Sequence, residues 1–331
     1  MKNMRKEISI DLHLHFDGSI SMANARELAK IEGVPLFSDD AKLKDALTVS
    51  PDCKNLGEYL TKFAFPLSLL QSEASIEKGM YNLCCELDAE GCIYAEIRFA
   101  PQLHLDKGLD QRKVVEAAIR GFKRSGIDGG LILCCMRGDD NLSLNETTVE
   151  IAREYLGKGV VALDLAGNEA GFPNLKFKSL FDRARELCVP YTIHAGEADG
   201  PESVRTALDM GAYRIGHGVR SIEDAELVSI LADKKIALEL CPTSNIHTMI
   251  FGDISEYPIR KFLQAGVVAT VNSDNRSVSS TTAGEEMRLL KNTFALTDEE
   301  EKTLLHSSVN AAFADESLKE KLHKLVEESF S

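Results

Sequence analysis

Histidines and acids stand at the ends of several apolar stretches of this chain. In the first, ISIDLHLHFDGSI (residues 8–20), His13 and His15 are two residues apart. Side chains of a β-strand alternate between its faces, so both imidazoles project from one face. Three further apolar stretches run into HAGE, GHG and NSD, which adds His194, Glu197, His217 and Asp274. The six side chains form a candidate site if these stretches are neighbouring strands.

Nitrogen and oxygen donors of this kind, without a thiolate, are typical of a site for Zn²⁺ or a similar divalent metal ion with one position open for water. The pKa of such a water falls towards neutrality, and the water becomes a nucleophile for hydrolysis. A single histidine at a strand end is more often a structural residue than a ligand. The hypothesis of one zinc ion per chain therefore depends on several histidines occurring together.

The elements that must position these residues follow a regular pattern. Eight apolar, β-branched runs are separated by amphipathic stretches such as residues 109–126, and the runs cover residues 8–15, 92–100, 130–137, 159–167, 190–197, 213–218, 235–245 and 266–274. Continuous apolar runs alternating with helices are typical of a parallel sheet covered by helices. We predict an α/β fold with a single (β/α)8 TIM-type barrel domain over residues 1–331. The carboxyl ends of barrel strands converge at one rim, where barrel active sites lie. A doubly wound sheet is the alternative, but no GxGxxG follows the first run.

The stretch between the first two runs is too long for one crossover. Within residues 20–90, Leu56, Tyr59, Leu60 and Phe63 have helical spacing. We expect a helical insertion that covers the site as a lid, although a packed outer layer fits the spacing equally well. A helical tail is expected after the last run, up to Ser331.

Composition disfavours several classes of partner. The formal net charge is −14, with acidic residues spread along the chain, which disfavours nucleic acid. No stretch has the roughly 18 to 20 consecutive apolar residues that a membrane helix needs, and the N-terminus lacks the apolar core of a signal peptide. We therefore expect a cytoplasmic enzyme with free thiols among its eight cysteines, a small-molecule substrate and no protein partner.

In the identity and order of five motifs, the chain resembles bacterial members of the adenosine deaminase family. These motifs are DLHLHFDGSI, DLAGNE, HAGE, GHG and VNSDN. AEIRFAP, LCCMRG, CPTSN and VNAAF support the resemblance, which covers nearly the whole chain. This family belongs to the metal-dependent amidohydrolase superfamily of distorted (β/α)8 barrels. The resemblance implies a zinc-dependent aminohydrolase of purine metabolism.

The resemblance also implies roles for individual residues. The zinc ligands would be His13, His15, His194 and Asp274. Glu197 would protonate N1 of the purine, His217 would orient the attacking hydroxide, and Asp274 would accept a hydrogen bond from it. Gly167 would offer its backbone to the N3 side and Asp17 would contact the ribose, so that the substrate-binding residues are Asp17, Gly167, Asn275 and His15.

One motif departs from the family pattern. Well-known members read Asp-Asp-Pro where this chain reads Asp274-Asn275-Arg276. The second Asp bonds N7 of the purine, which is only an acceptor, so that Asp must be protonated to donate, whereas the amide of Asn275 donates at any pH. Arg276 is interpreted as a surface loop residue, or alternatively as a contact for an anionic group of the substrate.

These observations predict hydrolytic deamination of adenosine and 2′-deoxyadenosine to inosine and ammonia. The alternative within the same chemistry is a deaminase of adenine or of a modified or 5′-substituted adenine nucleoside. A metal-dependent amidohydrolase of cyclic amides or esters is less well supported, because such barrels often use two metals bridged by a carboxylated lysine and no lysine ends a strand here. A non-catalytic barrel that binds nucleosides is the remaining alternative.

Overall fold

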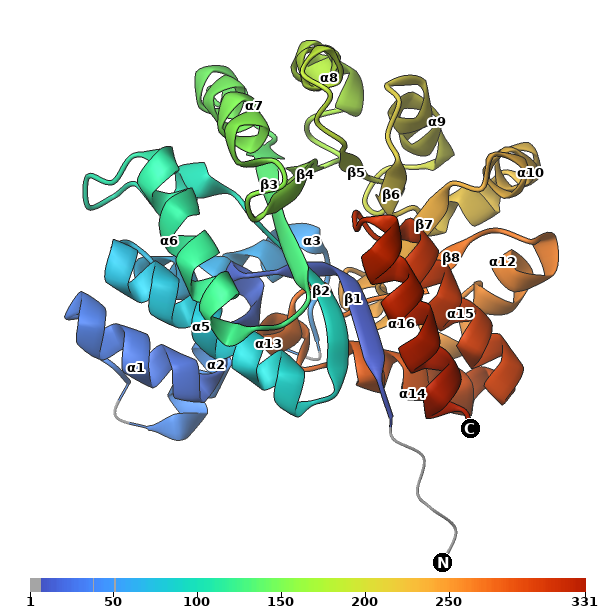
Figure 1. Cartoon of the computed structure of the whole chain (residues 1–331), viewed down its shortest axis with the longest axis horizontal. Coiled ribbons are helices and arrows are strands. Elements are labelled where there is room, and N and C mark those ends of the chain that lie inside the picture. The colour runs from blue at the N-terminus through green and yellow to red at the C-terminus, as the bar shows by residue number, and fades with distance from the viewer. Residues whose placement is uncertain (1–6, 38, 51) are drawn as a thin grey trace, which may run out of the picture.

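The chain folds around a ring of parallel strands. The computed structural model describes residues 7–37, 39–50 and 52–331, and within these residues the strands are β1 (Ser9–His15), β2 (Cys92–Phe99), β3 (Gly129–Met136), β4 (Val160–Ala166), β5 (Thr192–Ala195), β6 (Arg214–His217), β7 (Ala237–Leu240) and β8 (Ala269–Val271). They form two four-stranded sheets, β1 to β4 and β5 to β8, in chain order. Single parallel bridges, Leu163 to Tyr191 and Leu14 to Asp274, join the sheets at both seams. The predicted barrel is confirmed, in a distorted form (Figure 1).

Helices surround this ring. They are α1 (Met22–Glu32), α2 (Asp40–Leu47), α3 (Leu56–Leu60), α4 (Ala64–Ser68), α5 (Glu73–Ala89), α6 (Gln111–Ser125), α7 (Leu142–Tyr155), α8 (Lys178–Glu186), α9 (Pro201–Asp209), α10 (Ala225–Lys234), α11 (Pro242–His247), α12 (Ile259–Ala265), α13 (Arg276–Ser279), α14 (Ala283–Phe294), α15 (Asp298–Ala311) and α16 (Glu316–Ser329). Short 3₁₀ turns lie at Asp17–Ser19, Thr61–Phe63, Pro101–Leu103, Asn174–Phe177, Val219–Glu223 and Ile254–Glu256. None of these described helices combines the length and apolar character that a membrane crossing requires.

Each predicted run overlaps one strand, and the main discrepancy lies at the seventh. The run over residues 235–245 is longer than β7, which ends at Leu240. Pro242 is at the start of α11, where the missing N–H and the fixed φ of proline suit a first helical turn. The carboxyl end of β7 therefore passes directly into a short helix.

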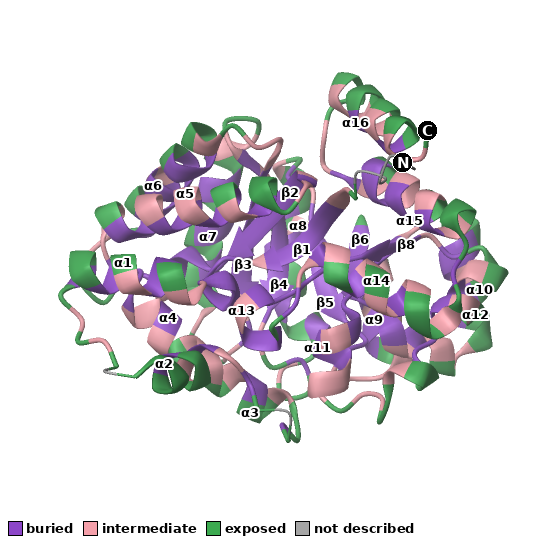
Figure 2. Ribbon diagram, turned by 90° about the horizontal axis from the view of Figure 1, so that it is seen from below, coloured by how far each residue is buried: buried purple, intermediate pink, exposed green. Residues whose placement is uncertain are grey.

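Burial explains why these segments form a barrel. The strands are almost entirely buried, with apolar side chains toward the helices and several charged side chains inside the barrel, whereas the helices bury one side only (Figure 2). In α6, which lies within the amphipathic stretch over residues 109–126, the buried side includes Val114, Val115, Ala118, Ile119 and Phe122. Asp110 caps this helix, and Gly126 ends it at φ 80°. Inner and outer layers thus share one apolar core.

The segment between β1 and β2 is helical, with α1 to α5 lying beside the barrel (Figure 1). It contacts the segment that follows β8 directly. The backbone N–H of Val49 donates to the carbonyl of Val278 (2.9 Å), and the Tyr59 hydroxyl lies 2.7 Å from that of Ser279. The insertion and the segment after β8 are therefore joined by hydrogen bonds at the carboxyl rim.

The C-terminal helices cover another part of the barrel. Leu305, Val309 and Leu322 pack with Ile10 and Leu12 of β1 in a second apolar cluster. The predicted helical tail is confirmed and consists of α14, α15 and α16.

Candidate active site

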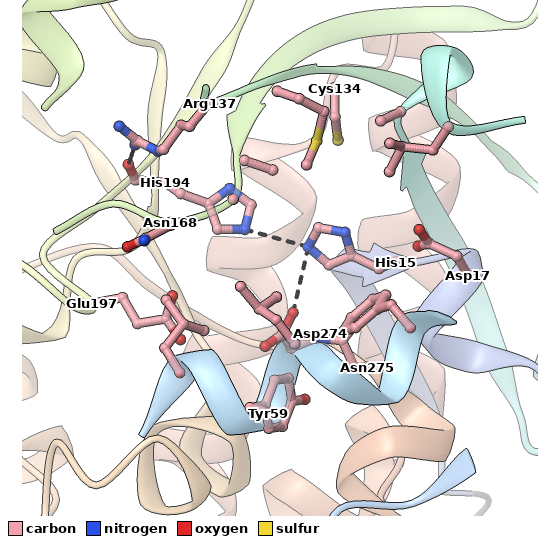
Figure 3. A pocket seen from close by; sticks show the side chains of 18 of the residues that line it. His15, Asp17, Tyr59, Cys134, Arg137, Asn168, His194, Glu197, Asp274 and Asn275 are labelled. Carbon is pink, nitrogen blue, oxygen red and sulfur yellow. Dashed lines mark hydrogen bonds and ion pairs between the residues drawn. The ribbon is translucent and has the colours of Figure 1, made fainter. Parts of the chain in front are cut away.

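Four predicted metal ligands meet at the carboxyl rim. His15 Nε2 lies 3.3 Å from His194 Nε2 and 3.5 Å from Asp274 Oδ1, as the dashed lines of Figure 3 show. His13 Nε2 lies 3.5 Å from the same Asp274 oxygen. The structure thus brings together all four side chains that the sequence predicted as ligands, from β1, β5 and the segment after β8.

Buried carboxylates orient two of these imidazoles through hydrogen bonds at Nδ1, the ring nitrogen that faces away from the cluster. His13 Nδ1 is 2.8 Å from Glu239 Oε2, and His194 Nδ1 is 2.9 Å from Asp164 Oδ2. A carboxylate accepts, so each Nδ1 donates and each Nε2 presents a lone pair. In agreement, His13 Nε2 is buried and has no hydrogen-bond partner among the described residues.

Arg98 balances the charge of these carboxylates inside the barrel. Its guanidinium lies 2.9 Å from Asp164 and 2.8 Å from Glu239, and Arg214 lies 2.6 Å from the second oxygen of Glu239. Burial alone would raise the pKa of Glu239, but the two arginines hold it at about 2. Both carboxylates are therefore ionised throughout the neutral range.

The cluster fits a divalent metal ion. Donor atoms of His13, His15 and Asp274 all lie within 4.8 Å of one another, as do those of His13, His194 and His217. Burial lowers the pKa of His13 and His15 well below the usual value, and nearby cationic groups add to this. Neutral imidazoles with a free Nε2 lone pair are the form that binds metal.

Two residues of the site have unusual backbone conformations. His217 has φ 57° and Asp274 has φ 59°, a region that bulky L-residues rarely occupy. At Asp274 the surrounding bonds hold this conformation, because its N–H donates to the His13 carbonyl (2.8 Å) and its carbonyl accepts from the N–H of His15 (2.7 Å). The seam between β8 and β1 thereby aims the carboxylate at the histidines.

Glu197 lies in a loop whose backbone is hydrogen-bonded to the carboxylate of Glu169. The Glu169 carboxylate accepts from the backbone N–H groups of residues 196 to 199 at 2.7 to 3.0 Å and from the Ser203 hydroxyl. Glu197 itself lies 3.6 Å from His217 Nε2. Burial raises the pKa of Glu197 well above the usual value, and the charges of Asp274 and Glu169 raise it further. This carboxyl group is therefore protonated more readily than an ordinary glutamic acid.

A cavity of about 280 Å³ opens beside the cluster. Figure 3 shows Glu197 and Asp17 at opposite sides of this cavity, with the histidines between them. Gly167 and Asn275 also contribute to its wall, and the apolar lining includes the insertion residues Leu56, Tyr59, Leu60, Phe63 and Leu67. All the residues predicted to bind substrate thus lie around one cavity.

One side-chain oxygen in each of two polar cavity residues lacks a hydrogen-bond partner. The Oδ1 atoms of Asp17 and Asn275 are buried without a hydrogen-bond partner among the described residues. Gly18 lies between them, and a Cβ there would be 1.9 Å from Asn275 Oδ1. Burial raises the pKa of Asp17 to about 6. Unpaired buried polar atoms are costly, and a ligand in the cavity would give them partners.

Both interpretations of Arg276 are wrong. It is the first residue of α13 and is buried, and its guanidinium forms an ion pair with Glu90 and lies 3.8 Å from Glu86, both on the insertion helix α5. It is neither a surface residue nor part of the lining of the cavity. Burying a guanidinium requires an acidic partner, which the distant α5 supplies.

The sequence reasoning missed the residues that support the site. Asp164, Glu239 and Arg98 are charged residues inside apolar strands, and charges in otherwise buried strands were the available signal. Cys241 was not expected near the cluster, but its sulfur lies within 4.8 Å of donor atoms of His217 and Asp274. Burial raises the pKa of this thiol well above the usual value, so it stays neutral and is a weak ligand.

Fold and site together define a class of protein. A parallel (β/α)8 barrel with a metal-binding histidine and aspartate cluster, and with a buried acid beside it, is a hydrolase of the metal-dependent type. The chain belongs to the adenosine deaminase family, whose sequence profile, described as adenosine deaminase, matches residues 9–329.

Known proteins support this assignment. The chain is 48% identical over 313 residues to an adenosine deaminase of Haemophilus ducreyi, covering 92% of this chain and 91% of the relative. The structure superimposes on an adenine deaminase of Arthrobacter aurescens with a TM-score of 0.86 at 25% identity, covering 97% of this chain and 98% of that one. An Arabidopsis N6-mAMP deaminase also gives 0.86 at 25% identity, with 97% of each chain covered.

Proposed function

We propose that this protein deaminates adenosine, and also 2′-deoxyadenosine, to the inosine nucleosides and ammonia. The observation that carries the proposal is the position of Glu197, a buried acid with a raised pKa, across one cavity from Asp17 and beside the histidine cluster. The adenosine deaminase of Haemophilus ducreyi, 48% identical to this chain, supports the substrate.

Zinc is the metal ion that we propose for the cluster. Its ligands would be His13, His15, His194 and Asp274, a set of nitrogen and oxygen donors without thiolate. When bound, the ion supplies Lewis-acid chemistry and brings the pKa of a water molecule close to neutrality.

The side chains then divide the proton transfers between them. Protonated Glu197 donates to purine N1 while the attacking water oxygen bonds to C6, and Asp274 accepts the proton that the water loses. In the second half, Asp274 returns that proton to the 6-amino group and the C6–N bond breaks, releasing ammonia. The proton of the C6 hydroxyl passes to Glu197, and N1 keeps its proton, which gives the hypoxanthine ring.

The other side of the cavity favours a nucleoside over a nucleotide. Asp17, with its unpaired oxygen, suits a ribose hydroxyl and repels a phosphate. Arg137 is the one arginine or lysine in the lining among the described residues. Its guanidinium already donates to the carbonyls of Phe172 (2.7 Å) and His194 (2.6 Å) and to Asn174. Of its nitrogens, only Nε lacks a hydrogen-bond partner among the described residues, so most of its donors are already used and are not available for a 5′-phosphate.

The insertion is proposed to act as the roof of the cavity. Its apolar side chains Leu56, Leu60 and Phe63 face the bound base in this arrangement, where they exclude water from the reacting atoms. The insertion and the barrel would then form a single functional domain.

Comparing substrates tests the proposal. Purified protein is incubated with adenosine, 2′-deoxyadenosine, adenine and adenosine monophosphate, and ammonia release is measured with the change in ultraviolet absorbance. We expect kcat/KM to be largest for the two nucleosides. A clear preference for adenine or for the monophosphate would overturn the proposed substrate while leaving the deaminase chemistry in place.

A further inference from the structure

A buried hydrogen-bonded chain stands behind His217, on the side away from Glu197. The Asn245 side-chain nitrogen lies 3.1 Å from His217 Nδ1, and the hydroxyl of Tyr257 lies 3.1 Å from Asn245 Oδ1. All three side chains are at most 2% exposed. Asn245 lies in α11, and neither it nor Tyr257 is part of the cavity lining, so both act on the site only through His217.

Tyr257 determines which way the Asn245 amide points. A phenol has one hydrogen to donate, and Asn245 Oδ1 is the only acceptor recorded for Tyr257 within the described residues. With the amide reversed, an NH₂ group would face the phenol, and the phenolic hydrogen would be buried without an acceptor. The hydroxyl oxygen of Tyr257 already accepts from the backbone N–H of Cys241. The amide oxygen therefore faces Tyr257 and the NH₂ group faces His217.

An amide NH₂ group fixes the tautomer of the histidine that it contacts. Because the amide donates to Nδ1, this nitrogen must be an acceptor, and a neutral ring then carries its proton on Nε2. Nε2 is the nitrogen that lies 3.6 Å from Glu197. His217 thus presents an N–H group to the place where the chemistry occurs.

Comparison with two other histidines strengthens this point. Glu239 and Asp164 accept from Nδ1 of His13 and His194, which leaves a lone pair on each Nε2. At His217 the Asn245 amide, a donor, takes the place of the carboxylate. The proton is therefore on Nε2 and the lone pair on Nδ1. Imidazoles of one cluster are thereby prepared for two different tasks by the residues behind them.

We propose that Asn245, oriented by Tyr257, is a positioning residue that keeps the proton of His217 on Nε2, so that His217 donates a hydrogen bond to the attacking oxygen and does not accept its proton. The proton of the water then goes to Asp274, as in the steps above. This inference rests on the proposed deaminase function for the identity of the attacking oxygen, but the tautomer itself can be measured independently.

Nitrogen NMR of the metal-loaded protein, labelled with ¹⁵N-histidine, tests the inference. The resonances of His217 are assigned by their loss in His217→Asn. We expect an unprotonated Nδ1 and a protonated Nε2 in the unmodified chain. A protonated Nδ1 would overturn the proposal, whatever the protein's activity.

Asn245→Asp reverses the polarity, because a carboxylate accepts from Nδ1. We expect the proton to move to Nδ1 and kcat for adenosine to fall roughly 10- to 100-fold, with KM and metal content nearly unchanged. Tyr257→Phe frees the amide to reverse and should give a mixture of tautomers with a smaller loss. It serves as a second variant if Asn245→Asp folds poorly.

Asn24→Asp is the matched control, since Asn24 is equally buried and its amide donates to the Gly79 carbonyl in the insertion. It should leave the His217 resonances unchanged. A shifted proton in Asn245→Asp with normal kcat would overturn the functional part of the inference. Failure of the unmodified enzyme on adenosine, with the expected tautomer present, would instead count against the proposed function.

Discussion

His13 and His194 reach the active site from strands, and the Nδ1 atom of each donates to an ionised, buried carboxylate. By contrast, short helices at the rim supply Leu56, Leu60 and Phe63. The first region, the metal end, is charged, continuous with the barrel interior and fixed by several short hydrogen bonds. The second, the roof, is apolar and part of an insertion. We infer from this difference that the barrel holds the groups that carry out the chemistry, while the insertion and the loop after β8 contribute, together with Asp17 and Gly167, to the recognition of the purine.

Removing the acid of the metal end should have the largest effect. Glu197→Gln keeps the size of the side chain but cannot supply a proton to N1, so kcat for adenosine should fall by roughly 10²- to 10⁴-fold. Metal content should stay at the level of the unmodified enzyme. Turnover close to the original value would show that another group protonates the purine.

The carboxylates behind the histidines should affect the metal ion more than the substrate. Asp164→Asn weakens the acceptor for His194 Nδ1 and leaves Arg98 with one partner fewer. Metal affinity, measured by competition with a chelator, should fall roughly 10- to 100-fold. Unchanged affinity would mean that Asp164 contributes only to folding, which thermal unfolding of the same variant measures separately.

Asn275 lies where the two regions meet, and its replacement should introduce a pH dependence. In Asn275→Asp the new carboxyl group donates to N7 only while protonated, so KM for adenosine should rise with pH as the group ionises, to about tenfold at neutral pH. The unmodified enzyme should show no such rise, because an amide donates throughout this range. Parallel KM profiles for the two enzymes would exclude a hydrogen bond from residue 275 to the base.

Trimming the roof should have the smallest effect. Phe63→Ala removes apolar contact with the base, and we expect KM to rise roughly three- to tenfold with little change in kcat or metal content. Leu142→Ala, at an exposed position in α7, controls for the loss of apolar surface elsewhere. A large fall in kcat with unchanged KM would instead indicate that the roof positions the reacting atoms.

The same comparison explains what could be predicted from sequence. The metal end is visible there because His13 and His15 have the spacing of one strand face, and because HAGE, GHG and NSD each end an apolar run. Period-two patterning and convergence of strand ends were sufficient to predict the cluster.

The remaining features depend on contacts between distant segments, which no local pattern encodes. Arg276 is neutralised by Glu90, far away in the chain. Asn245 faces His217 only because α11 begins directly after β7. Opening of the ring into two sheets joined by single bridges likewise follows from packing, since all eight runs look alike in sequence.

Metal dependence of adenosine turnover tests the central claim most directly. The protein is stripped with a chelator, assayed for ammonia release from adenosine, and assayed again after addition of one equivalent of zinc per chain. We predict loss of turnover on stripping and its recovery near one equivalent. Turnover that persists in protein shown to be free of metal, or a zinc-loaded protein that leaves adenosine unchanged, would contradict the account.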